Sequence, residues 1–152
     1  MKDNAAEELT QEPLPRPIRE IEKMFEAGQL GSDPKIARFR LINGLRWYND
    51  WEYSGHNPDF RSAGNPVSGE AYTSGDRWTA VWREIPAHCR RFAEWVLIED
   101  KTIRDWQKHC PIYNRTRRER NVLTRTLWDI LDKIGERYKR GFKETEPMRK
   151  TI

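Results

Sequence analysis

The chain has 152 residues and a formal net charge of +4, from 28 Lys and Arg against 24 Asp and Glu. This length suits one domain with tails and argues against a two-domain enzyme. Charged residues make up 34% of the chain, a composition typical of disordered proteins, but seven Trp, five Tyr and five Phe supply apolar surface for a folded core. We therefore expect one folded domain with polar margins.

The sequence carries no signal for a membrane or for secretion. No apolar run approaches the roughly 18 residues of a membrane-spanning helix, and the acidic N-terminus lacks the basic and then apolar layout of a signal peptide. Two cysteines, Cys89 and Cys110, are too few for a disulfide scaffold. The sequence thus predicts a cytoplasmic protein with reduced cysteines and no membrane contact.

Charge is distributed unevenly along the chain. Residues 1–32 hold 4 basic and 7 acidic side chains, residues 33–110 hold 12 and 11, and residues 111–152 hold 12 and 6. A polyanion is attracted by local clusters of Lys and Arg, so the last third is where a nucleic-acid-facing surface is expected. A basic helix face that is merely solvated would give the same count, and this alternative stays open.

Apolar spacing and helix-boundary signals predict an all-α fold of five or six helices. Residues 1–15 combine acidic side chains with Pro13 and Pro15, which predicts a disordered acidic leader. A single helical domain is expected over residues 16–140. Residues 141–152 are expected to form a flexible tail.

Two helices are expected in the first third of the domain. A short helix follows from the apolar spacing of Ile18 to Phe25 and is closed by Gly28 and Gly31. A long helix begins at Ser32-Asp33-Pro34, because an Asp cap followed by Pro at the first helical position is a strong start signal, and it runs to Ser54.

A long loop and two further helical segments occupy the middle of the chain. Residues 54–75 hold four Gly and two Pro with scattered apolar groups, which predicts a long central loop. Thr73-Ser74-Gly75-Asp76 opens the next helix, and Pro86 separates it from an apolar segment over 89–97. Two pairs of tryptophans at i, i+4 spacing are expected in the core, namely Trp47 with Trp51 and Trp78 with Trp82.

Residues 101–140 have the layout of a helix-turn-helix unit, a common device for placing a helix against DNA. Its first helix is expected to begin at Thr102. The turn covers residues 109–113, because Pro111 lacks a backbone N–H and disfavours helix in the residue before it. Asn114 is then expected to cap the second, longer helix.

The second helix has one apolar and one basic face. The apolar stripe consists of Leu123, Leu127, Ile130, Leu131, Ile134 and Tyr138. Arginines crowd its first two turns, where the helix dipole disfavours cations by a few tenths of a kcal/mol each, so an external anion is expected to offset them. The candidate nucleic-acid-binding residues are Arg115, Arg117, Arg118, Arg120, Asn121, Thr124 and Arg125.

These residues have distinct expected roles. Arg115, Arg117, Arg118 and Arg120 would hold phosphates of double-stranded DNA, while Asn121 and Arg125 would lie nearest the base edges. The first alternative is an acidic protein surface as the partner of this helix. The second is a plain solvated face.

The sequence supports a metal site or a catalytic site less well than a nucleic-acid-binding helix. His88-Cys89 and His109-Cys110 are pairs of good zinc ligands, but neighbouring residues on a helix point about 100° apart and no C-x-x-C spacing accompanies them. Asp100 and Asp105 stand where acids ordinarily precede or begin a helix. We therefore expect no metal, no cofactor and no enzymatic activity.

The chain also resembles a known family. The segments 41–48, 95–100 and 115–127, followed by Leu131 and Tyr138, are similar to an uncharacterised alphaproteobacterial domain family over roughly residues 36–140. That family forms the C-terminal module of phage-derived transcription regulators, including activators of gene transfer agents. Members usually show Gly-Trp in the turn where this chain has His109-Cys110.

The resemblance implies a phage- or prophage-type transcription regulator that works with host RNA polymerase through a sigma-type helix-turn-helix. The acidic leader and the 54–75 loop would be candidate polymerase contacts. The alternative is an antitermination or anti-sigma adaptor that binds the polymerase through protein contacts without independent DNA binding.

Overall fold

The computed structural model describes residues 17–54, 73–110 and 116–142. Within these ranges the chain is all-α, as predicted, with six α-helices and no strand. The helices are α2 (Glu20–Glu26), α3 (Pro34–Tyr53), α5 (Ser74–Glu84), α6 (Arg90–Ala93), α7 (Ile103–His109) and α8 (Arg117–Arg140). The predicted leader, almost all of the central loop, and the tail beyond 142 lie outside the described residues.

Local capping chemistry explains three helix starts that the sequence predicts. The Asp33 carboxylate accepts a hydrogen bond from the amide two residues on, at 2.9 Å, and Pro34 occupies the first helical position of α3. Thr73 and Asp76 form a reciprocal capping box at the start of α5. Thr102 caps α7 through its side-chain oxygen. These three boundaries are confirmed.

The predicted start of the last helix is wrong. Thr116 caps α8, because its Oγ1 accepts from the backbone N–H of Glu119 at 3.2 Å. The spacing Thr116-x-x-Glu119 matches a capping box, a more specific signal than the lone Asn114. Asn114 is therefore not the cap, and Arg115 precedes the helix instead of lying in its first turn; both residues lie outside the described ranges.

The segment after Pro86 is not one regular helix. A 3₁₀ turn (Ala87–Cys89) leads into α6, and a π-helical turn (Glu94–Ile98) follows it. Every residue from Phe92 to Ile98 is buried. A stretch with no exposed face has no amphipathic period, so the wider turn could not be predicted from the spacing of apolar residues.

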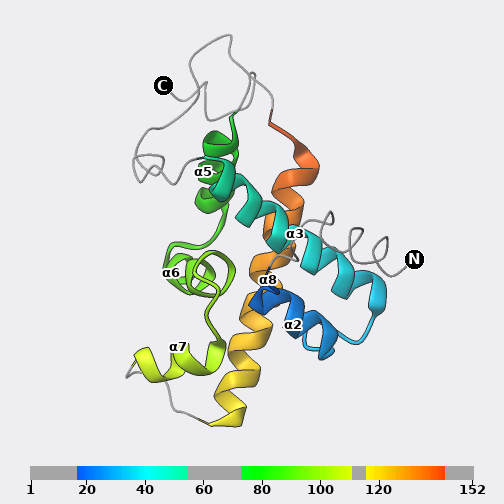
Figure 1. Ribbon diagram of the computed structural model, residues 1–152, viewed down its shortest axis with the longest axis vertical. Helices are drawn as coiled ribbons and strands as arrows, with labels where there is room; N and C mark the ends of the chain where they lie inside the picture. Colours follow the sequence, from blue (N-terminus) through cyan, green and yellow to red (C-terminus); the bar gives the residue numbers. More distant parts are fainter. Residues whose placement is uncertain (1–16, 55–72, 111–115, 143–152) are drawn as a thin grey trace, which may run out of the picture.

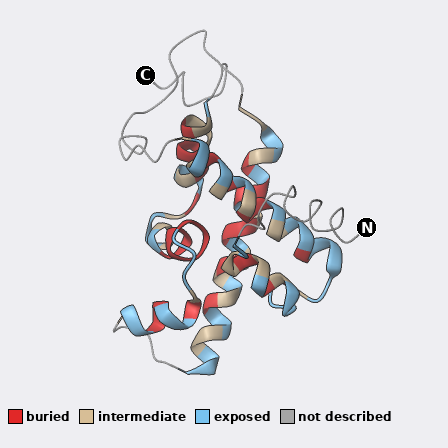
Figure 2. Cartoon of the chain, in the orientation of Figure 1, coloured by how far each residue is buried: buried red, intermediate tan, exposed pale blue. Residues whose placement is uncertain are grey.

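Helix α8 is the axis of the fold. It has 24 residues, about 36 Å, with α3 and α5 packed along it and α7 at its N-terminal end (Figure 1). Its predicted apolar stripe is buried from Leu123 to Ile134, and Tyr138 is half-buried. The buried positions of α8 lie where the helix passes the other helices, whereas its first two residues are exposed (Figure 2). No helix of the described ranges is both long and apolar enough to cross a bilayer.

Two stacked tryptophans join α3 to α5 in the core. The Trp47 and Trp78 rings stack with centroids 5.1 Å apart, and Trp47 Nε1 donates to the Trp78 carbonyl at 3.2 Å. Both side chains are almost fully buried, and Trp51 and Trp82 border them at the edge of the core. The prediction that these tryptophans belong to the core is confirmed. The closest stack, however, joins one member of each predicted pair, Trp47 of α3 and Trp78 of α5.

Helices α3 and α8 cross at close range where α8 has Gly135. A Cβ on Gly135 would overlap the side chains of Asn43 and Phe39. Asn43 is 1% exposed, and its Nδ2 donates to the Leu131 carbonyl at 3.0 Å. The crossing therefore depends on the missing side chain of one glycine and on one buried amide.

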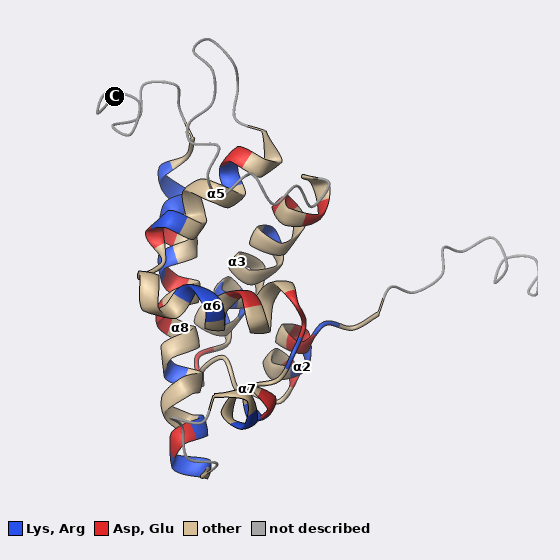
Figure 3. Cartoon of the chain, turned by 90° about the vertical axis from the view of Figure 1, so that its left-hand side faces the viewer, with Lys and Arg blue, Asp and Glu red and all other residues tan. Residues whose placement is uncertain are grey.

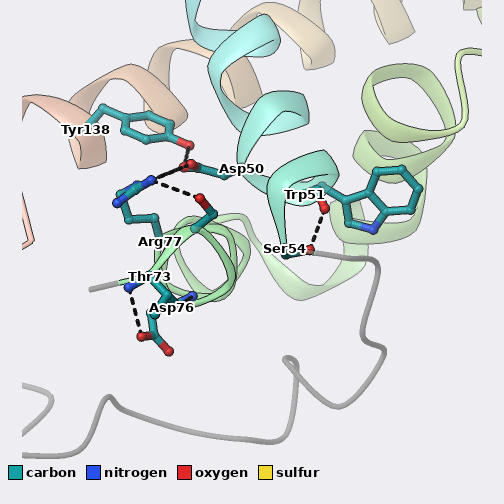
Figure 4. Close-up of polar contacts among 8 residues, drawn as sticks. Asp50, Trp51, Ser54, Thr73, Asp76, Arg77 and Tyr138 are labelled. Atoms are coloured by element: carbon teal, nitrogen blue, oxygen red, sulfur yellow. Dashed lines mark hydrogen bonds and ion pairs between the residues drawn. The ribbon is translucent and has the colours of Figure 1, made fainter. Parts of the chain in front are cut away.

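A buried carboxylate fixes the other end of α8. Asp50 accepts from Arg77 Nη2 at 3.0 Å and from the Tyr138 hydroxyl at 2.5 Å, so it joins α3, α5 and α8 (Figure 4). Burial, together with the neighbouring negative charge of Asp50, raises the pKa of the Tyr138 hydroxyl. The C-terminal half of α8 is thus tied to α3 and α5, and its N-terminal third packs against α7.

Candidate nucleic-acid interface

A groove of about 620 Å³ lies between α2, α7 and the N-terminal third of α8. The α8 wall consists of Arg117, Arg120, Asn121, Thr124, Arg125 and Trp128. Helix α7 contributes Arg104, and α2 contributes Glu20 and Met24. We call this feature the α7–α8 groove.

The α8 wall is built from two rows of side chains, each with i, i+4, i+8 spacing. Arg117, Asn121 and Arg125 are exposed and form the rim. Arg120, Thr124 and Trp128 are half-buried and lie deeper. Residues four apart share one side of a helix, so each row presents its side chains in the same direction. Five of the seven predicted residues therefore meet in one place.

The other two predicted residues are not in the groove. Arg118 is exposed on the outer face of α8 and does not line the groove, and Arg115 lies outside the described ranges. Val122, one turn beyond Arg118, is 53% exposed. An exposed valine between basic side chains suits contact with a thymine methyl group, and the sequence interpretation missed it. Its spacing from Arg118 was the available signal.

The groove carries an excess of positive charge. Four arginines line it against one carboxylate, Glu20, among its described lining residues. In the part of the chain that the structure describes, Arg104, Arg117 and Arg125 form no ion pair. Several other arginines do pair with carboxylates: Arg40 with Asp132, Arg77 with Asp50, Arg91 with Glu99 and Arg140 with Glu84.

In Figure 3 the positions of Lys and Arg are coloured blue, and several lie at the α7 end of α8. Like charges held in a cleft raise its local potential and attract anions. Arginine, in addition, matches phosphate geometry with two parallel hydrogen bonds. The groove is therefore suited chemically to phosphate groups.

Glu20 modulates this charge. Burial raises the pKa of its carboxyl, Lys23 opposes the shift, and the nearby carboxylates of Asp100 and Asp105 add to it. Glu20 thus takes up a proton at a higher pH than an ordinary glutamate. Protonation of Glu20 as the pH falls consequently makes the groove more positive.

Thr124 is restricted in what it can do. Its Oγ1 donates to the Arg120 carbonyl of the preceding turn at 2.8 Å. The hydroxyl proton is therefore engaged within the helix, and only the oxygen lone pairs face a ligand. Thr124 is one of the predicted nucleic-acid-binding residues, but in this geometry its hydroxyl cannot donate to a phosphate oxygen.

Trp128 forms a rigid part of the wall. Its Nε1 donates to the Gln29 carbonyl at 2.7 Å, and the Arg40 guanidinium lies 4.6 Å from the ring centroid. Arg40 is itself held by Asp132 at 3.0 Å. Sequence reasoning missed Trp128, although it stands one turn after Thr124. It also missed Arg104 and Glu20, which no local pattern connects to α8.

Helices α7 and α8 are neighbours at one end of the molecule (Figure 1). Gln107 Nε2 donates to the Thr116 carbonyl at 3.1 Å, which ties the end of α7 to the cap of α8. His109 packs on Trp95 with ring centroids 4.8 Å apart. Residues 111–113 of the predicted turn, like residues 114 and 115 that follow it, lie outside the described residues.

The residues considered for metal or acid chemistry have other contacts. The Asp100 Oδ1 accepts from the backbone N–H of Glu20 at 2.6 Å, so Asp100 caps the start of α2. Cys89 and Cys110 are half-buried free thiols. In the described ranges no three His, Cys, Asp or Glu side chains gather as metal ligands would.

The chain was compared with protein-family models, with curated proteins and with solved structures. None of the three comparisons finds a match.

Proposed function

We propose that the protein is a phage- or prophage-type transcription regulator that binds double-stranded DNA through a helix-turn-helix formed by α7 and α8, in concert with host RNA polymerase. One observation carries the DNA part of this proposal. Arg104, Arg117, Arg120 and Arg125 converge on one groove, and three of them lack a carboxylate partner among the described residues. The resemblance of the sequence to phage-derived regulators supports the partner and the biological role.

The outer face of α8 would supply the duplex contacts. Arg118 and Val122 project from it, and Asn121 and Arg125 stand at the adjoining rim. Arg and Asn pair with guanine and adenine edges, and an apolar side chain meets the thymine methyl group. The rim arginines, Arg117 and Arg125, would hold the flanking phosphates.

The adaptor alternative has its own support on α3. Ile36, Phe39 and Ile42 are 46%, 45% and 46% exposed, and they lie among the exposed cations Lys35, Arg38 and Arg46. Exposed apolar side chains gathered on one helix are typical of a protein-binding surface. An adaptor would dock this surface on an acidic, partly apolar region of the polymerase.

Fluorescence anisotropy with a labelled duplex of about 30 base pairs at low salt distinguishes direct DNA binding from the adaptor alternative. We expect Arg118→Ala and Arg125→Ala each to weaken binding about fivefold, which corresponds to about 1 kcal/mol for one lost contact. Arg38→Ala and Arg83→Ala are matched controls. They remove the same charge from exposed arginines whose guanidinium groups have no partner in the described ranges.

The outcome is decisive in both directions. If the folded protein shows no affinity for any duplex at low salt, direct DNA binding is wrong and the adaptor proposal is favoured. In that case Phe39→Ser should abolish retention of host polymerase on the immobilised protein. If all four arginine variants weaken duplex binding equally, the choice of α8 as the contact helix is wrong.

A further inference from the structure

The shape of the groove does not match a duplex. A duplex is read by an element that protrudes into its major groove, about 12 Å wide. Arg120, Thr124 and Trp128 instead lie deep in a concave space between three helices. A rod-shaped duplex meets the rim of such a space and the outer face of α8. The interior suits a thinner ligand.

The dimensions suit a single strand. Arg117 and Arg125 stand eight residues apart on α8, about 12 Å along the helix axis. That distance corresponds to about three nucleotides stacked at about 3.4 Å. The volume of about 620 Å³ lies within the range of roughly 300 to 1,000 Å³ that is ordinary for sites holding small ligands.

The chemistry of the wall also suits unpaired nucleotides. Proteins that bind single strands combine a basic channel for the backbone with aromatic rings on which bases stack. Arg104 from α7 lies across the groove from the α8 arginines, and Trp128 supplies an aromatic ring at the inner end of the deep row. Met24 adds apolar surface from α2.

Trp128 is held in place before any ligand arrives. The hydrogen bond to Gln29 fixes the indole edge, and Arg40 covers one face of the ring. Arg40 is in turn fixed by Asp132 and by the Leu30 carbonyl, at 3.0 and 2.7 Å. A ring held this firmly loses little conformational entropy on binding, so stacking on it is favoured.

We propose that the α7–α8 groove binds an unpaired stretch of single-stranded DNA, with phosphates on its arginines and a base stacked on Trp128. The choice of DNA as the polymer rests on the proposed function, whereas the preference for a single strand rests on the groove itself. Duplex binding and strand binding would share the rim arginines, but each also has side chains of its own: Arg118 lies outside the groove, whereas Arg104 and Trp128 line it.

The test measures anisotropy of a labelled 12-nucleotide oligo-deoxythymidine and of a labelled duplex with the same set of variants. Trp128→Leu and Arg104→Ala should each weaken binding of the single strand fivefold or more. Arg118→Ala should weaken duplex binding and leave single-strand binding unchanged. Trp51→Leu, in a half-buried tryptophan of α3 that does not line the groove, is the control for Trp128→Leu.

Each result has a defined meaning. If duplex binding is intact but the oligonucleotide does not bind, or binds Trp128→Leu and Arg104→Ala as well as wild type, the inference is wrong and the proposed function stands. If thymidine triphosphate binds as tightly as the oligonucleotide, the site serves a free nucleotide and the inference is overturned. Arg104→Ala changes an exposed side chain, so it keeps the test valid if Trp128→Leu does not fold.

Discussion

Replacing Gly135 by alanine tests the crossing that positions α8. In an exposed helix this change stabilises by about 1 kcal/mol, because alanine has the higher helix propensity. Here the new Cβ would overlap Asn43, whose buried amide is bonded to the Leu131 carbonyl, and the ring of Phe39. Overpacking costs about 1–3 kcal/mol, and a buried amide that loses its partner costs about 1–3 kcal/mol more.

The net expectation is a loss of about 2 kcal/mol in the free energy of unfolding, measured by urea denaturation followed by circular dichroism. In an Asn43→Ala background the Cβ has room, since the half-exposed Phe39 ring can turn toward solvent. There Gly135→Ala should be neutral or stabilising by up to about 1 kcal/mol, which gives a coupling of about 2–3 kcal/mol. Asn49→Ala, at an exposed position of α3, is the control for helix propensity. Stabilisation by the single variant, or simple additivity of the two changes, would refute the reasoning.

Three further predictions concern single side chains. Glu20→Gln removes the groove's described carboxylate and should raise affinity for DNA about twofold to fivefold at low salt, whereas unchanged affinity in anisotropy titrations would contradict the charge argument. The raised pKa of Tyr138 makes its contribution to stability fully present below about pH 10 and lost as the pH rises further, so wild type should lose stability in alkaline urea titrations and Tyr138→Phe should show a flatter profile. Thr116→Ala should cost about 1 kcal/mol of stability as a lost cap, and Asn114→Ala should cost nothing measurable; the reverse order in thermal melts would restore Asn114 as the cap.

Much of the fold could be predicted because its signals are local. The caps Asp33, Thr73 and Thr102 each depend on residues within one helical turn, and each is confirmed. The apolar stripe of α8 can be recognised in the sequence because the other face of the helix is polar. The π-helical turn (Glu94–Ile98) has no such contrast between apolar and polar positions, because all of its residues are buried. The wrong cap at Asn114 came from choosing an isolated cap residue over the paired signal of Thr116 and Glu119.

The candidate site was only half predictable, for a different reason. Helical spacing predicts one face with Arg118, Asn121 and Arg125, flanked by Arg117. The structure brings Asn121 and Arg125 together with Arg117 in the groove but leaves Arg118 out of it. Spacing cannot show which flank of α8 a distant helix will approach. Helix α2, about 100 residues earlier in the chain, closes one flank with Glu20, and this separates the groove residues from Arg118.

The central claim is that the α7–α8 groove arginines bind the phosphates of nucleic acid. The most direct measurement is the slope of the logarithm of the binding constant against the logarithm of salt concentration, for wild type and for two double variants of equal charge. Each phosphate contact adds about 0.7 to single-strand slopes and about 0.9 to duplex slopes.

We expect Arg117→Ala/Arg125→Ala to reduce the steepness by about 1.4 to 1.8, the sum for two contacts. Arg38→Ala/Arg83→Ala, which lowers the net charge by the same amount away from the groove, should leave the slope unchanged. Equal slopes for the two double variants would contradict the account, because net charge alone would then explain the binding.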